Sequence, residues 1–328
     1  MPPQVQYEIS MAGWRVFGWL FCAVLAAVSA SRAQVEIQPR PKRPAAAPPG
    51  PHSPTLRVDT TLVLVPVSVS DPLNRPVSGL EKENFRLFQD KVEQPITHFA
   101  MDDEPIAVGL VFDTSGSMGD KLRRSRMAAA EFFRTANPED EFFLVEFDDS
   151  PRLEVPLTTN TGRIENQLTF SRSHGSTALL DAIYLSLHEM KRSKKNKKAL
   201  LIISDGGDNH SRYTPREVNN VVVESDALIY SIGVFGGAAS AEEMGGPGLL
   251  SRISEQTGGR LFYADAGDLP DIARKIGVEL RNRYVLGYAP KDQPRDGKYH
   301  RIEVKVIPPR GLPKLRAHWR LGYNAPVE

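Results

Sequence analysis

Eight residues about one third of the way along the chain combine side chains that bind hard cations. The stretch FDTSGSMG, residues 112–119, holds one carboxylate and three hydroxyls. Asp113, Ser115 and Ser117 follow each other as D-x-S-x-S, and all three offer hard oxygen atoms. Oxygens of this kind suit Mg²⁺, Mn²⁺ or Ca²⁺. The pattern therefore predicts a divalent-cation site, although Asp and Ser also form tight turns and helix caps.

Two other loops carry oxygen donors that can reach the same place. Thr177 stands just before a helical pattern in SHGSTALLDA, and Asp205 ends an apolar run in KALLIISD. Ligands of parallel α/β sheets bind at the carboxyl ends of the strands. We therefore expect five side chains to meet at one edge of a sheet, namely Asp113, Ser115, Ser117, Thr177 and Asp205.

These five residues, in this order, resemble the metal-ion-dependent adhesion site of von Willebrand factor A-type domains. The resemblance covers about residues 106–273, and none of the five positions departs from the pattern. It implies a Rossmann-like fold and a bound divalent cation, with Mg²⁺ as the first expectation and Mn²⁺ or Ca²⁺ as alternatives. It also implies that an Asp or Glu of a partner protein completes the coordination, because an ion with few charged ligands stays electrophilic.

Alternating apolar and amphipathic segments predict the fold of residues 104–283, the expected A-type domain. Strand-like runs lie at 106–113, 141–148, 198–205, 227–235 and 259–264. Helical patterns stand between several of these runs. Near-continuous apolar strands alternating with amphipathic helices indicate a sheet that helices cover on both faces. We therefore expect a doubly wound, mostly parallel α/β sheet.

The segments on either side of this domain have the character of antiparallel strands. Residues 56–101 and 284–324 contain short β-branched or alternating runs, separated by turns rich in Pro, Gly and Asp. Either segment alone has too few strands for a stable core. We expect them to pair into one discontinuous β-sandwich. Their layout also resembles a bacterial family known as VWFA-related, acidobacterial type, which implies an exported protein.

The N-terminus has the pattern of a secretory signal peptide. Arg15 precedes an apolar run, and the small residues of SASRAQ follow it, so we expect a signal at 1–33 with cleavage after Ala33. Met11 is an alternative start, and an uncleaved anchor is the competing interpretation of the apolar run. A Pro-rich linker follows at 34–55. We expect a periplasmic, secreted or surface protein with no transmembrane helix after signal removal.

Composition excludes several classes of function. The net charge of +1 is far from the basic excess of a general nucleic-acid binder, so we expect no nucleic-acid partner. The one cysteine, Cys22, lies within the predicted signal peptide. The mature chain would therefore have no thiol for disulfides, for a Cys-ligated zinc or for cysteine catalysis.

Three residues beside the predicted donors have weaker interpretations. His174 and His210 lie in the two loops that carry Thr177 and Asp205, where a surface role or a place at the rim of the site fits them. Asp208 is interpreted as a possible outer group of the same site. The chain contains neither G-x-S-x-G nor H-E-x-x-H, so we expect no catalytic residue and no enzyme.

Three functions remain to be distinguished. The leading hypothesis is an exported, non-catalytic module whose metal captures an acidic residue of an unknown partner protein. The alternative is an envelope scaffold or assembly protein in which the metal is structural. A hydrolase that uses Ser115 or Ser117 is the third hypothesis.

Overall fold

The computed structural model describes residues 62–235, 245–264, 268–290 and 296–327. All elements below belong to the unit Val58–Glu328. The predicted signal peptide and linker lie outside the described residues. Within the described ranges, no helix combines the length and apolar character needed to cross a membrane.

A six-stranded sheet forms the α/β part, in the order β10-β9-β8-β5-β6-β7. Its neighbouring strands run parallel except for the edge strand β7, which pairs antiparallel with β6. All eight residues of β5 are buried, as expected for a strand that is covered on both faces. The strands are β5 (Ile106–Asp113), β6 (Glu141–Phe147), β7 (Pro151–Thr158), β8 (Lys197–Ser204), β9 (Leu228–Gly233) and β10 (Leu261–Tyr263).

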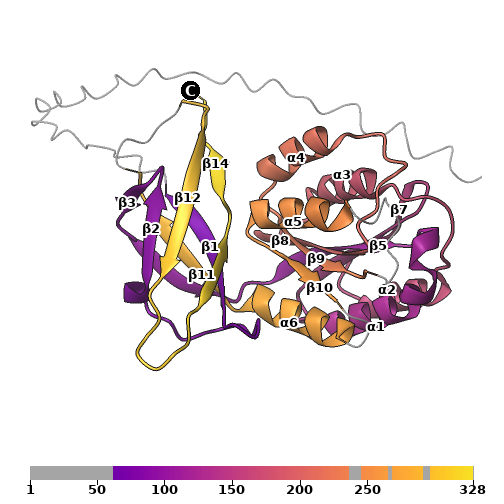
Figure 1. Ribbon diagram of the computed structural model, residues 1–328, viewed down its shortest axis with the longest axis horizontal. Helices are drawn as coiled ribbons and strands as arrows, with labels where there is room; N and C mark the ends of the chain where they lie inside the picture. The colour runs from indigo at the N-terminus through magenta and orange to yellow at the C-terminus, as the bar shows by residue number, and fades with distance from the viewer. Residues whose placement is uncertain (1–61, 236–244, 265–267, 291–295, 328) are drawn as a thin grey trace, which may run out of the picture. The chain divides into compact units, whose positions relative to one another are not determined.

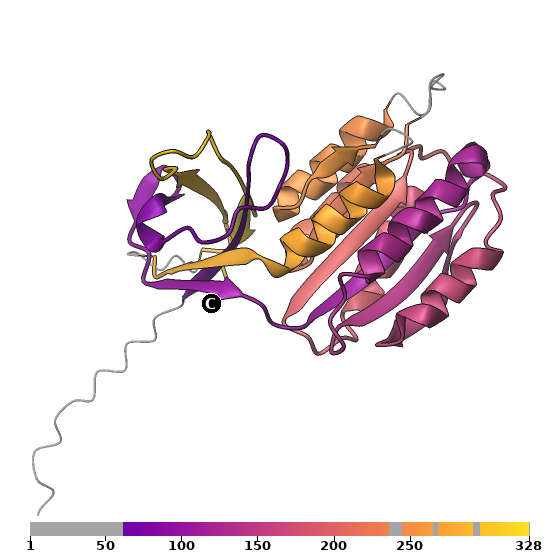
Figure 2. The ribbon, with the colours of Figure 1, turned by 90° about the horizontal axis from the view of Figure 1, so that it is seen from below.

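Helices cover both faces of this sheet (Figure 1). On one face α1, α2 and α6 pack against Val108, Leu110 and Phe112 of β5, and α3, α4 and α5 pack on the other face. Figure 2 shows α1 and α6 side by side across the first face. The helices are α1 (Leu122–Phe133), α2 (Thr161–Phe170), α3 (Leu179–Met190), α4 (Pro215–Glu224), α5 (Gly246–Thr257) and α6 (Leu269–Arg281). Two short 3₁₀ helices are η1 (Lys82–Asn84) and η2 (Gly116–Lys121).

Two four-stranded antiparallel sheets form the β part, in the orders β13-β1-β11-β4 and β14-β12-β2-β3. Both sheets contain strands from before and from after the α/β part. Their inner faces share one core, in which Leu87 and Val304 of one sheet meet Val67 and Tyr284 of the other. The strands are β1 (Val63–Ser70), β2 (Phe85–Gln89), β3 (Val92–Gln94), β4 (His98–Asp102), β11 (Arg283–Tyr288), β12 (Tyr299–Val306), β13 (Arg316–Trp319) and β14 (Gly322–Asn324).

This architecture confirms the predicted fold class, a mostly parallel α/β sheet flanked by a discontinuous β-sandwich. The sequence analysis did not predict β7, whose segment PRLEVPLT contains two prolines. Proline lacks a backbone donor and is confined in sheets to edge strands and strand ends, and β7 is an edge strand. The boundaries proposed at residues 104 and 283 stay predictions.

Gly109 provides a test of packing at the centre of the α/β sheet. A Cβ at this position would lie 2.2 Å from Cζ of Phe143 and 2.7 Å from Cδ2 of Leu200. We expect Gly109→Ala to lower the free energy of unfolding by about 1–3 kcal/mol, because overpacking forces neighbouring side chains to move. Urea unfolding measures this change. Gly248→Ala is the matched control, since no atom lies within 4 Å of its added Cβ, and an equal loss in both variants would contradict the prediction.

Candidate metal centre

The Asp113 carboxylate lies fully buried at the carboxyl end of β5. Its Oδ1 accepts a hydrogen bond of 2.9 Å from the backbone N–H of Ser115, and its Oδ2 accepts one of 2.5 Å from the hydroxyl of Ser204. Thr114 donates its backbone N–H to the carbonyl of Phe147 at the end of β6. The carboxylate is therefore fixed between the ends of three neighbouring strands.

The hydroxyls of Ser115 and Ser117 follow in the turn that opens η2. Ser115 is the N-cap of η2, but its side chain makes no capping hydrogen bond. The two hydroxyl oxygens lie 3.1 Å apart, and neither bonds to the backbone of any described residue. Asp113 does stabilise the turn through the N–H of Ser115, so the turn interpretation holds for the carboxylate and does not explain the two serines.

Backbone hydrogen bonds join the second loop to the first. His174 donates its N–H to the carbonyl of Thr114, and Gly116 donates to the carbonyl of Gly175 over 3.1 Å. Gly175 has a φ of +72°, and a Cβ there would lie 2.7 Å from Oδ2 of Asp149. The residue must therefore be glycine for both conformational and steric reasons.

The same loop is joined to the third loop at Thr177. Its N–H donates to Oδ1 of Asn209 at 2.8 Å, and its carbonyl accepts from the backbone N–H of Asn209. A methyl group on Gly207 would lie 4.0 Å from Oγ1 of Thr177 and 3.7 Å from Oδ1 of Asp205. The two oxygens therefore border the same space, and the hydroxyl of Thr177 has no hydrogen-bond partner in the described part of the chain.

Asp205 is also buried, and its carboxylate forms an ion pair with a lysine that the sequence analysis did not include. The Nζ atom of Lys121, at the end of η2, lies 3.0 Å from Oδ2 of Asp205. The lysine side chain itself is 17% exposed. All five predicted residues thus lie on three loops that meet at the carboxyl edge of the sheet, and Lys121 reaches the same place from η2.

Burial makes ionisation of Asp113 unfavourable in the absence of a cation. Desolvation, together with the nearby charge of Asp205, raises the pKa of Asp113 to about 7, although hydrogen bonds from Ser115 and Ser204 oppose the shift. A divalent cation would remove this penalty, because it attracts both carboxylates. The set of two carboxylates and three hydroxyls is also the hard-oxygen set that Mg²⁺ takes. The residues therefore fit a divalent cation.

Sequence reasoning missed Ser204 and Lys121. Ser204 directly precedes Asp205 at the end of β8, and this adjacency was an available signal, because the C-terminal residue of a strand beside β5 can reach Asp113. Asp208, interpreted as an outer group of the site, accepts instead from the N–H groups of Leu180 and Ser211 and so holds the start of α3.

A second acidic group lies at the rim of the site. Asp148, Asp149 and His174 bring their side-chain atoms close together. Arg152 already binds both oxygens of Asp148 at 2.7 Å and lowers the pKa of that carboxyl. Asp149 accepts from the N–H of Ser176 at 2.7 Å and thereby supports the loop of Thr177.

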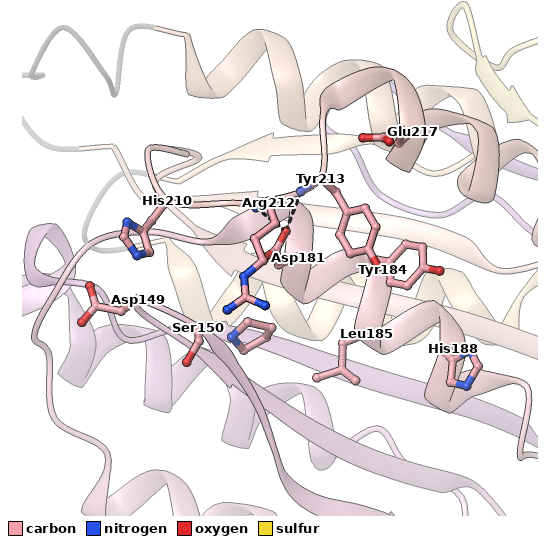
Figure 3. Close-up of a pocket in the computed structure, with 11 residues that line it drawn as sticks. Asp149, Ser150, Asp181, Tyr184, Leu185, His188, His210, Arg212, Tyr213 and Glu217 are labelled. Carbon is pink, nitrogen blue, oxygen red and sulfur yellow. Dashed lines mark hydrogen bonds between the residues drawn. The ribbon is translucent and has the colours of Figure 1, made fainter.

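A groove of about 1010 Å³ begins at this rim and extends along α3. Figure 3 shows Asp149 and His210 at one end of it and the rings of Tyr184 and Tyr213 farther along. The two tyrosine rings stack with centroids 4.0 Å apart. Asp181 holds the loop of Tyr213 by accepting its backbone N–H. The groove thus contains none of the five predicted donors, but Asp149 and His210 at its end belong to loops next to them.

Comparison with known proteins gives one family match, to the von Willebrand factor type A domain over residues 108–207. A curated relative, an uncharacterized protein of Borreliella burgdorferi, is 26% identical over 209 residues, which are 54% of this chain and 60% of the relative. This chain therefore spans less than two thirds of the relative's length.

Solved structures with similar folds include a von Willebrand factor type A protein from Catenulispora acidiphila, with 12% identity and a TM-score of 0.48 over 74% of this chain and 75% of that one. The vWF domain of the type V pili tip protein Mfa5 from Porphyromonas gingivalis has 13% identity and a TM-score of 0.44, over 56% of this chain and 98% of that one. These similarities carry no conclusion about function. The matched residues 108–207 include all five predicted metal ligands and show that this part of the chain is similar to a von Willebrand factor type A domain.

Proposed function

We propose that the protein is an exported, non-catalytic binding module that captures an acidic residue of a partner protein through a divalent cation, Mg²⁺ above all. One observation carries the proposal. Two buried carboxylates, those of Asp113 and Asp205, meet at the carboxyl edge of the sheet beside the exposed Ser117. The buried side offers charge to a cation, and the exposed side leaves room for a partner.

Five residues of the site are the proposed ligands of the cation. The ion would be held by Asp113, Ser115, Ser117, Thr177 and Asp205. When bound, the ion supplies an electrophilic position for one carboxylate oxygen of the partner. Three of the five donors are neutral hydroxyls, so an additional carboxylate meets little charge repulsion within the site. The rim groove along α3 would then contact residues that flank the captured Asp or Glu.

Binding to a partner should depend on both the metal and Asp113. A pull-down from envelope extracts in Mg²⁺ should recover a partner that is lost in EDTA and with Asp113→Ala, because each change removes the electrophilic position. Circular dichroism should show that the variant stays folded. Asp120→Ala is the matched control, since Asp120 is an exposed aspartate in η2 of the same loop. Recovery of the same partners under all four conditions would contradict the proposed function.

Lys121 should compete with the metal for Asp205. Its ammonium lies 3.0 Å from Oδ2 of that residue, and a charge-assisted hydrogen bond of this kind must be given up or rearranged when the metal binds. We expect Lys121→Met to tighten Mg²⁺ binding by roughly tenfold, the effect of losing one such bond. Isothermal titration calorimetry measures the affinity, with Lys194→Met as the exposed-lysine control. Weaker binding by Lys121→Met would show that the lysine positions Asp205 instead.

Metal affinity should also depend on pH through Asp113. Because its pKa is raised from 3.8 to about 7, the metal-free folded protein holds a proton between these values that the unfolded chain has lost. The contribution of Asp113 to the free energy of unfolding of the metal-free protein therefore falls as the pH rises through this window. Mg²⁺ must displace the proton, so its affinity should rise up to about tenfold per pH unit below 7 and level off above it. Calorimetry from pH 5.5 to 8.5 tests this, and a constant affinity would contradict it.

A further inference from the structure

A buried arginine without a partner lies at the start of β11, away from the metal centre. Arg283 is 4% exposed, and its Nε atom is buried with no hydrogen-bond partner. Among the described residues, it forms neither an ion pair nor a side-chain hydrogen bond. Arginine stays charged in proteins, and an uncompensated buried charge is costly. The side chain therefore calls for an anion.

The charged neighbours of Arg283 are already paired with one another. Lys197 binds Asp102, with Nζ 3.1 Å from Oδ1. Arg260 binds Glu279, which also accepts from the hydroxyl of Tyr230 at 2.9 Å. Asp102 lies directly opposite Arg283 in the pairing of β4 with β11, but its Oδ1 is taken by Lys197.

Three of these groups, Tyr230, Glu279 and Asp102, act on Arg283 electrostatically without pairing with it. Burial lowers the pKa of its guanidinium, and electrostatic interactions with Tyr230, Glu279 and Asp102 oppose this shift. Each of the two carboxylates already has a cationic partner, so Arg283 is the cation without one in this group of described residues.

Arg283 lines a cavity of about 630 Å³. Alternate residues of β11 explain its direction, because Tyr284 and Leu286 point into the sandwich core while Arg283 and Val285 line the cavity. Much of the remaining lining is apolar and includes Leu64, Pro66, Ala100, Ile106 and Leu228. The volume lies in the range of small-ligand sites, which combine an apolar lining with a few polar anchors.

We propose that this cavity binds a small organic monocarboxylate, whose carboxylate group pairs with Arg283 and whose apolar body lies against the cavity wall. The planar guanidinium matches a carboxylate through two parallel hydrogen bonds. A single carboxylate would pair with the one guanidinium that has no partner among the described residues around it. The acidic residues Asp103, Glu104 and Asp226 also line the cavity, and they disfavour anions of higher charge such as phosphate.

Sodium hexanoate is a suitable probe, because it joins one carboxylate to a short apolar chain. Calorimetry and thermal melting of the full chain should show that hexanoate binds and raises the melting temperature. Hexylamine, which has the same chain and the opposite charge, and inorganic phosphate at matched ionic strength should do neither. No effect of hexanoate, or an equal effect of either control compound, would overturn the proposal.

Substitutions of Arg283 test whether hexanoate binds at this residue. Arg283→Met should weaken hexanoate binding at least about tenfold, because it removes a charge-assisted bond. Arg283→Lys keeps the charge but loses the two parallel hydrogen bonds of the guanidinium, so it should weaken hexanoate binding less. It replaces Arg283→Met in the test if that variant does not fold. Lys198→Gln is the matched control, since Lys198 is a half-buried cation lining the same cavity. Unchanged binding by both Arg283 variants, or an equal loss in Lys198→Gln, would contradict the assignment.

Discussion

The burial of the Asp113 carboxylate at the end of β5 is the constraint on which the carboxyl edge of the sheet depends. β5 is the strand from which the sheet extends in both directions, and helices cover both of its faces. Water cannot stabilise a charge at this position, so neighbouring groups must do it. Hydrogen bonds from Ser115 and Ser204 supply part of this stabilisation. They do not prevent the pKa of Asp113 from rising to about 7.

Asp148 shows how the same fold treats a buried carboxylate that needs no cation from outside. It lies at the end of the neighbouring strand and is equally buried. Arg152 binds both of its oxygens, and its pKa is lowered where that of Asp113 is raised. The contrast distinguishes a carboxylate with an internal counter-charge from one that lacks it. Among the two, Asp113 is the one suited to an ion from solution, and its neighbour Asp205 has a lysine that such an ion would have to displace.

The features that could be predicted from the sequence are those that depend on the local pattern of apolar and polar residues. The five predicted donors stand at strand ends or before a helix, so the parallel topology was enough to expect them at one edge. Lys121 could not be assigned in this way, because its contact with Asp205 depends on how η2 turns after Gly116. The sequence analysis placed Arg283 at the end of the α/β domain, whereas the structure makes it the first residue of β11. Its lack of a partner follows from the competition of Lys197 for Asp102, which only the three-dimensional arrangement reveals.

The two sites lie at opposite ends of the same strands. Asp113 ends β5, whereas Ile106, which lines the Arg283 cavity, begins it. Eight residues of strand span about 25 Å at roughly 3.3 Å per residue, so the two sites are too far apart to share a ligand. The carboxyl edge is built from loops that hold buried negative charge, and near the amino edge lies the buried guanidinium of Arg283, which has no partner among the described residues. The proposed cation site and the proposed anion site thus stand at the two ends of one sheet, and each is inferred from a buried charged side chain that the described part of the fold leaves without sufficient compensation.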